Sequence, residues 1–269
     1  MHKQQSKKGG CMKKIIGCLL AVLFASAVQA ESVRAGKRYE SKTVQIPSFQ
    51  SVVVADDIEV DFAQRAPQSA VISGASNLVA LVDLHVQDET LTVSFSRPVK
   101  VRGENRLKVF LTAPKLSQVT VSNKGELEVQ GLLEVTELQV YASQNGDFSA
   151  DSVKTDSLLV RASDRAEVNI ERLSAQTVKA VASGRADIEL GGSAEDIYLE
   201  NNGSGSIDAE DLRTATATAV NNTNGEVKVF ALQKLTAEAN GRGRIEYKGF
   251  PKELTPRGRT SKIVQEIDD

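Results

Sequence analysis

Residues 138–150, LQVYASQNGDFSA, contain the pattern that decides the fold. Apolar residues at every second position indicate two short β-strands with one face inward, separated by a polar turn at Gly146. The phrase returns as residues 158–170, LLVRASDRAEVNI, and as residues 178–190, VKAVASGRADIEL. Seven copies are present, with turn residues Gly125, Gly146, Ala166, Ala186, Gly205, Gly225 and Gly243. A fixed period of about 20 residues predicts a solenoid, in which each repeat buries its apolar side chains against its neighbours.

Alignment of the copies on the turn residue places apolar side chains in columns. One column stands six positions before the turn: Val119, Val140, Val160, Ala180, Leu199, Ala219 and Ala237. Another stands two positions after it: Leu127, Phe148, Val168, Ile188, Ile207, Val227 and Ile245. A third lies in the stretches between copies: Leu133, Val153, Leu173, Ala194, Leu212 and Leu232. The columns predict an all-β fold, a single-stranded parallel β-helix with paired strands ~4.8 Å apart, and crossover chirality favours a right-handed coil.

A small hydrogen-bonding residue stands three positions before every turn. The column consists of Ser122, Ser143, Ser163, Ser183, Asn202, Asn222 and Asn240. Such side chains satisfy a bent backbone locally, and asparagine also tolerates left-handed dihedral angles. We therefore predict a structural ladder along one corner, with like side chains bonded from rung to rung. The alternative is a row of hydroxyl and amide groups that binds a ligand.

Charged residues flank the turns. Directly after them come Glu126, Asp147, Glu167, Asp187, Ser206, Glu226 and Arg244, and directly before them come Lys124, Asn145, Arg165, Arg185, Ser204, Asn224 and Arg242. These positions predict a mixed-charge outer face that keeps the rod in solution, with little stability from each exposed pair. The functional alternative is a stacked row of carboxylates that binds calcium or a cationic partner.

Candidates for catalysis are few. His85 is the single histidine outside the N-terminal leader, and alternation within its strand points it toward solvent. Asp57, Glu59 and Asp61 share one face of a strand and are the candidates for a calcium site, whereas a solvated strand face is the simpler interpretation. We expect no catalytic residue, no cofactor and no resident metal. The enzymatic alternative is a polysaccharide-acting β-helix that uses carboxylates.

The two ends of the chain differ from the repeats. Lys13 and Lys14 precede an apolar run over residues 15–28, and small residues at a cleavage spacing end at Ala30. This pattern predicts a signal peptide over residues 1–30, with Met12 as the start. Residues 31–43 are expected to form a linker, residues 44–251 the β-helix, and residues 252–269 a polar, disordered tail. The strands before the first repeat are expected to be further coils that close one end of the solenoid.

Composition limits the partners and the compartment. Removing the leader takes five of the 33 basic residues and no acidic residue, which leaves 28 basic against 35 acidic residues and a net charge of −7. Such a chain is a poor ligand for nucleic acid. No second apolar run is long enough to span a bilayer, and both cysteines, Cys11 and Cys18, fall in the leader. We expect an exported protein that is periplasmic, surface-located or secreted.

Several phrases outside the columns point to a family. They are FQSVVV at 49–54, LTV at 91–93, APKL at 113–116 and, after the repeated turns, NGRGRIEYKGFP at 240–251. With the period, they make the chain resemble, over roughly 44–251, the head GIN domain family of exported bacterial proteins labelled putative auto-transporter adhesins. The resemblance implies a β-helix-like fold and an envelope or secreted location. The expected function is a non-enzymatic adhesin or binding module for an envelope protein, surface glycan or host ligand, and the alternative is a structural or regulatory envelope module.

Overall fold

The computed structural model describes residues 30–103 and 106–266, so the predicted signal peptide lies outside the described residues, apart from Ala30. The elements before the repeats are β1 (Glu31–Arg34), β2 (Tyr39–Val44), β3 (Ser51–Val54), β4 (Glu59–Gln64), β5 (Ser69–Ala75), α1 (Ser76–Val79), β6 (Val82–Gln87), β7 (Thr90–Phe95), β8 (Val99–Arg102) and β9 (Lys108–Ala113). The repeats form β10 (Gln118–Val121), β11 (Glu126–Glu134), β12 (Glu137–Ala142), β13 (Asp147–Ala162), β14 (Glu167–Gly184), β15 (Asp187–Gly203), β16 (Ser206–Ala209), β17 (Leu212–Asn221), β18 (Glu226–Phe230), β19 (Lys234–Ala239) and β20 (Arg244–Lys248). The chain continues through β21 (Glu253–Gly258), η1 (Thr260–Lys262) and β22 (Ile263–Gln265).

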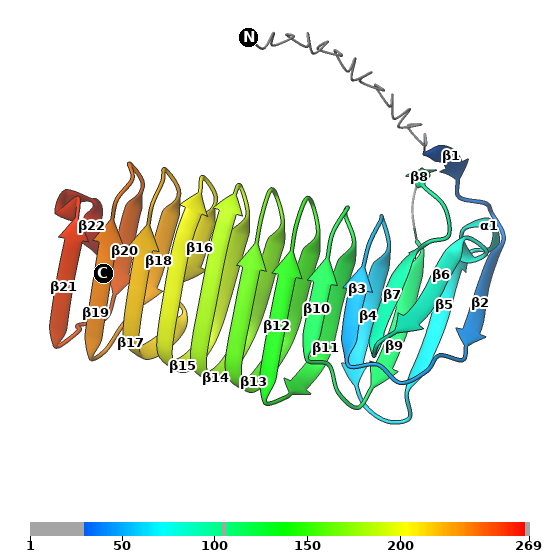
Figure 1. The fold of residues 1–269 in the computed structure, drawn as a ribbon, viewed down its shortest axis with the longest axis horizontal. Helices are drawn as coiled ribbons and strands as arrows, with labels where there is room; N and C mark the ends of the chain where they lie inside the picture. The colour runs from blue at the N-terminus through cyan, green and yellow to red at the C-terminus, as the bar shows by residue number, and fades with distance from the viewer. Residues whose placement is uncertain (1–29, 104–105, 267–269) are drawn as a thin grey trace, which may run out of the picture.

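The strands stack into a rod of parallel rungs (Figure 1). Each repeat pairs with the next in the register of the sequence columns, so that Val140 pairs with Val160, and Val160 with Ala180. The result is a β-solenoid of about seven turns with roughly 20 residues per turn. The predicted parallel β-helix is confirmed, and its long axis is the direction in which successive rungs add.

The sequence columns form the core. All seven members of the column before the turn are 0% exposed, and the members two positions after the turn are also buried. The third column holds with two exceptions: Ala194 is half-buried, and Leu232 is 43% exposed while its neighbour Ala231 is buried instead. The last full rung has a shorter connection between its strands than the earlier ones. The inward position there falls one residue earlier, so the prediction for Leu232 is wrong.

The turns are closed by local backbone hydrogen bonds. The Gly125 N–H donates to the Ser122 carbonyl at 2.8 Å, and the Gly146 N–H donates to the Ser143 carbonyl at the same distance. The turns also stack closely on one another, because a Cβ at Gly243 would overlap the carbonyl oxygen of Gly225 in the rung before. Glycine at this position is therefore required by the approach of two backbones.

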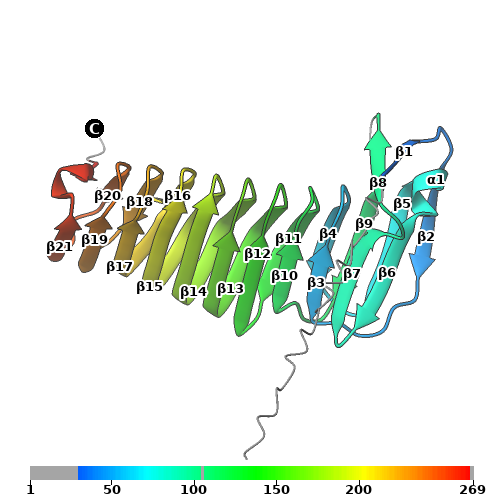
Figure 2. The ribbon, with the colours of Figure 1, turned by 45° about the horizontal axis from the view of Figure 1, so that its top comes forward.

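The N-terminal part is not a simple run of further coils. In space, the rung made by β3 and β4 lies between the rung of β7 and β9 and the rung of β10 and β11. Strand β5 pairs antiparallel with β9 and with β2, and β6 pairs antiparallel with β7. Figure 2 shows these strands and α1 gathered at one end of the rod. After β1 and β2, which lie at the capped end, the chain forms the rung of β3 and β4, builds the rest of the cap and returns to continue the solenoid.

Two predicted irregular segments are strands. Within the expected linker 31–43, β1 pairs parallel with β8 and β2 covers β5. Within the expected disordered tail, β21 pairs parallel with β19, and β22 with β20. The Arg259 N–H donates to the Ala239 carbonyl at 2.7 Å. The described parts of the expected linker and of the expected disordered tail form strands for the same reason: an exposed strand edge provides backbone partners even for a polar strand.

Candidate binding face

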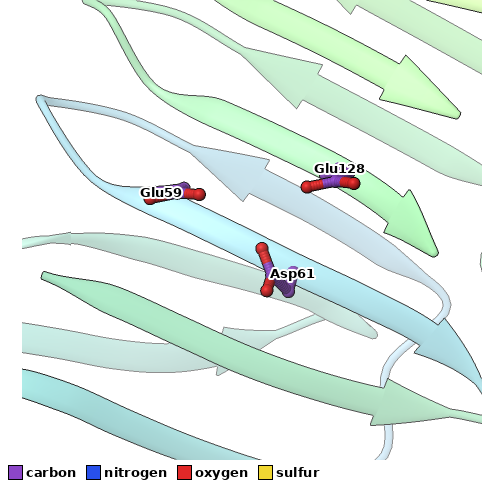
Figure 3. Close-up of side chains that lie close together, drawn as sticks. All are labelled: Glu59, Asp61 and Glu128. Atoms are coloured by element: carbon purple, nitrogen blue, oxygen red, sulfur yellow. The ribbon is translucent and has the colours of Figure 1, made fainter. Parts of the chain in front are cut away.

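The predicted acidic residues lie near the N-terminal end of the rod. Glu59 and Asp61 belong to β4, and the neighbouring strand β11 adds Glu128 (Figure 3). Each offers a carboxylate oxygen, and these atoms lie within 4.8 Å of one another. Asp57 precedes β4 and does not belong to this group. The structure therefore brings together two of the three predicted residues and adds one from the next rung.

A lysine balances this acidic group. Lys108 Nζ lies 2.5 Å from Glu59 Oε1 and 3.1 Å from Asp61 Oδ1, and Gln130 Nε2 donates to Asp61 Oδ2 at 3.0 Å. Burial alone would lower the pKa of Lys108, but its hydrogen bonds to Glu59 and Asp61 outweigh this effect and raise it. Asp61 is only 5% exposed, so the expectation of a solvated strand face is wrong for this residue. The cluster is an ion-pair network in which an ammonium takes the place a metal cation would need.

The Ser and Asn column divides into two halves. Asn240 Nδ2 donates to Asn222 Oδ1, and Asn222 Nδ2 donates to Asn202 Oδ1, each at 2.8 Å, so these three side chains form a ladder on the outside of the turns. The serines use other partners, as where Ser183 Oγ donates to the Ala162 carbonyl at 3.5 Å. A serine hydroxyl is too short to reach its counterpart one rung away, whereas an amide spans that gap.

Two further asparagines, which the sequence did not single out, lie buried on the inner side of the turns. Asn201 and Asn221 are 0% exposed. Asn221 Nδ2 donates to the carbonyls of Gly225 and Arg244 at 2.6 and 3.0 Å, and its Oδ1 accepts from the Thr223 N–H at 3.3 Å. Asn201 repeats this arrangement one rung earlier. The sequence signal for this pair is the doublet Asn-Asn at 201–202 and 221–222, where the copies at 142–143, 162–163 and 182–183 have Ala-Ser.

The acidic positions after the turns form a continuous row. Glu59, Glu126, Asp147, Glu167 and Asp187 pair in register on successive strands, ~4.8 Å apart. Burial, together with Glu59 and Asp147, raises the pKa of Glu126, and burial with Glu167 raises the pKa of Asp147. The charges at the turns are therefore more segregated than in the predicted mixed-charge face. The carboxylates stack on the sheet formed by β4, β11 and the first segments of β13, β14 and β15, which we call the acidic sheet.

The same sheet has a shallow hollow of about 370 Å³ lined by acids. They are Glu171, Glu189, Asp208, Glu210 and Asp211. Lys228 Nζ lies 3.3 Å from Asp208 Oδ2 and 3.2 Å from Glu210 Oε2. A carboxylate enzyme would need two free acids on either side of a substrate. Here the Lys228 ammonium pairs with both Asp208 and Glu210, so these two acids are not a free pair, and Glu171, Glu189 and Asp211 line the rest of the hollow.

A different side of the rod carries aromatic and cationic side chains together. Residues 137–142 of β12 and the matching segments of β13, β14 and β15 lie side by side in the middle of the rod (Figure 1). Their outward residues form a surface that we call the tyrosine–arginine face: Tyr141, Leu159, Arg161, Lys179, Val181 and Tyr198. Register places Tyr141 beside Arg161, and Lys179 beside Tyr198. These outward positions belong to none of the columns that the sequence made evident.

The two tyrosines are fixed by hydrogen bonds. Tyr141 Oη donates to Gln139 Oε1 at 2.8 Å, and Tyr198 Oη donates to Glu200 Oε2 at 3.1 Å. Burial and the hydrogen bond to Glu200 raise the pKa of Tyr198, so its phenol keeps its proton at neutral pH. Lys179 Nζ lies 5.2 Å from the centroid of the Tyr198 ring, within cation–π range. These groups are held in place before any ligand arrives.

Three shallow hollows lie next to one another on these strands and their turns. One of about 530 Å³ lies beside Tyr198, and one of about 320 Å³ lies beside Tyr141 and Arg161. The third, of about 440 Å³, lies at the turns and is lined by Arg165 and Arg185; we call it the arginine corner. Open neighbouring hollows suit an extended ligand that lies across several rungs better than a small molecule in an enclosed pocket.

Comparison with protein families identifies the class of protein. The model of the family described as putative auto-transporter adhesin, head GIN domain, matches residues 48–171 and 149–251. The chain therefore belongs to this family, and the predicted resemblance is confirmed. A comparison with curated proteins gives no match. No helix among the described residues is long and apolar enough to cross a membrane.

Solved structures share the fold. A putative adhesin from Parabacteroides merdae is 23% identical with a TM-score of 0.79, and the match covers 89% of this chain and 100% of the other. A putative lipid binding protein from Parabacteroides distasonis is 17% identical with a TM-score of 0.81, covering 88% and 100%. A putative adhesin from Bacteroides fragilis is 22% identical with a TM-score of 0.66, covering 87% and 100%. At these identities the likeness concerns the fold alone.

Proposed function

We propose that this protein is a non-enzymatic, exported binding module of the adhesin type, and that it holds its ligand on the tyrosine–arginine face. The observation that carries the proposal is the gathering of two anchored tyrosines and unpaired cations on one rigid sheet. Tyrosine and arginine are enriched among the residues that contribute most to binding surfaces. The family name, and the names adhesin and lipid binding protein given to the similar structures, all describe binding rather than catalysis.

The acidic sheet supports the non-enzymatic part of the proposal. Its two groups of convergent carboxylates each contain a lysine, Lys108 or Lys228, in ion pairs with the acids. In both groups the lysine offsets the repulsion between carboxylates that the stacking of strands brings together. The adhesin family indicates an exported protein, and we place its binding face in the envelope or outside the cell, where an extended ligand is accessible.

The test uses residues 31–269 and immobilised ligand panels of proteins and glycans. The double variant Tyr141→Ala/Tyr198→Ala removes the aromatic anchors, and Asn169→Ala on the acidic sheet is the control. The proposal predicts that any ligand retained by the wild type and the control is lost from the double variant. Equal binding by all three proteins would contradict the assignment of the face. Turnover of a polysaccharide that Glu210→Gln abolishes would contradict the non-enzymatic assignment.

A further inference from the structure

The cations of the tyrosine–arginine face and the arginine corner form a local positive surface on a negatively charged chain. Residues 157–166 and 177–186 contain four cations and one acid, whereas the full chain has a net charge of −2. The four cations are Arg161, Arg165, Lys179 and Arg185. The single acid in these two segments, Asp164, already accepts from the Gln144 N–H at 3.2 Å through its Oδ2. Glu200, which lies beside Val181, accepts from Tyr198 Oη at 3.1 Å.

These cations are available to a ligand. Within the described residues, the guanidinium groups of Arg161, Arg165 and Arg185 form no ion pair, in contrast to Lys108 and Lys228 on the acidic sheet. Arg161, Arg165 and Arg185 are exposed. Unpaired guanidinium groups on adjacent rungs repel one another modestly, and an anion between them would satisfy both through charge-assisted hydrogen bonds.

The backbone under this surface excludes one class of partner. The strand segments of β13 and β14 are paired on both sides, β13 with β12 and β14, and β14 with β13 and β15. No main-chain donor or acceptor is left for an added peptide strand, which is the usual source of affinity when a sheet takes up a peptide. A ligand here is recognised by side chains alone.

The shape excludes a second class. Leu159 and Val181, the apolar members of the face, are half-buried between longer polar neighbours and do not protrude. Insertion into a membrane needs exposed apolar side chains that enter the bilayer, so the class excluded is a bilayer that the face penetrates. What the surface offers instead is a pair of tyrosine rings, three open hollows and cations on adjacent rungs. Arg165 and Arg185 lie at neighbouring turns, and Arg161 and Lys179 lie on neighbouring strands in different outward columns.

From these features we infer that the tyrosine–arginine face and the arginine corner bind a linear acidic polysaccharide that lies along the rod axis. Its carboxylate or sulfate groups pair with Arg161, Lys179, Arg165 and Arg185, and its sugar rings pack on Tyr141 and Tyr198. Acidic polysaccharides carry charged groups at regular intervals, so one chain that lies across several rungs meets cations on adjacent strands and turns. This inference rests on the proposed function and specifies the ligand of the same face.

The experiment measures binding of residues 31–269 to polygalacturonate, which carries carboxylates, to heparin, which carries sulfates, and to neutral dextran. Binding to at least one acidic chain, at least about tenfold stronger than to dextran and weaker at high salt, is expected. The variant Arg161→Gln/Lys179→Gln should weaken it by about tenfold or more. The control Arg172→Gln, an arginine outside the face whose side chain is 66% exposed, should change it less than about twofold.

The outcomes separate this inference from the proposed function. Equal binding to dextran and the acidic chains overturns the inference, and so does unchanged binding of the acidic chain by Arg161→Gln/Lys179→Gln. Binding to phosphatidylglycerol vesicles but to neither acidic polysaccharide also overturns it. If a protein or neutral glycan binds instead and Tyr141→Ala/Tyr198→Ala abolishes that binding, the face is correct and the ligand class is wrong. Should a variant fail to fold, the wild-type protein decides the ligand class directly: displacement of the bound acidic chain by salt but not by excess dextran supports the inference, and displacement by dextran overturns it.

Discussion

Removal of the interior amide at position 221 tests how the solenoid is held together. In Asn221→Ala, the carbonyls of Gly225 and Arg244 lose their donor and the Thr223 N–H loses its acceptor. Asn221 is fully buried, so water does not replace these bonds without rearrangement. Each unsatisfied buried group costs about 1–3 kcal/mol. We expect a total loss of unfolding free energy of about 2–4 kcal/mol, because part of the corner can relax.

The matched control is the neighbouring exposed residue. Asn222→Ala removes the ladder bonds to Asn202 and Asn240, where water is available as a substitute, and should cost about 1 kcal/mol or less. Urea unfolding followed by circular dichroism gives both values. Because rungs interact only with their neighbours, hydrogen exchange should show the loss of protection concentrated in residues 216–230 and 244–248. A cost for Asn221→Ala no larger than that for Asn222→Ala would refute the reasoning.

Three further predictions concern the row of acids, the turns and the C-terminal rung. Burial raises the folded-state pKa of Glu126 and Asp147, so their ionisation destabilises the fold as pH rises above about 4. The variant Glu126→Gln/Asp147→Asn should therefore have a higher Tm than the wild type at pH 7. In thermal melts over a pH series, this difference in Tm should vanish near pH 3. Gly243→Ala forces a methyl group into the Gly225 carbonyl and should lower the Tm far more than Ala186→Gly, and similar melting of the two variants would contradict the close stacking. Deletion of residues 253–269 uncovers Leu235 and Ile245, which are now 0% exposed, and should lower the Tm and the exchange protection of β19 and β20; unchanged protection would mean that the last rung is not part of the solenoid.

The repeat was predictable because it is set by inward residues. Side chains such as Val140 and Phe148 must fill the same volume in every rung, so their columns stay apolar in all seven copies and give the period, the strand faces and the parallel pairing. The N-terminal order was not predictable in this way. Strand β3 pairs with β10, across a segment that forms the cap and contains antiparallel strands, and alternation has the same period in parallel and antiparallel strands.

The candidate site was harder to predict because a binding surface is set by outward residues. Tyr141 and Tyr198 stand in different outward columns and three rungs apart, so no column shows them together. The acids Glu59 and Asp61 stood out in the sequence, but their partner Lys108 lies 47 residues beyond Asp61 and reaches them only through the pairing of β4 with β9. Adjacency on a solenoid surface follows from register, which the sequence defines well only after the rungs have been aligned.

Hydroxyl-radical footprinting, with and without a saturating acidic polysaccharide, tests the binding face most directly. Oxidation of exposed side chains is read residue by residue by mass spectrometry, and no variant is needed. The account predicts reduced oxidation of Tyr141, Leu159 and Tyr198, with no change at Leu132 and Phe110, which are 51% and 41% exposed on other parts of the rod. Unchanged oxidation of both tyrosines in the presence of bound polysaccharide, or protection centred on Phe110, would contradict it.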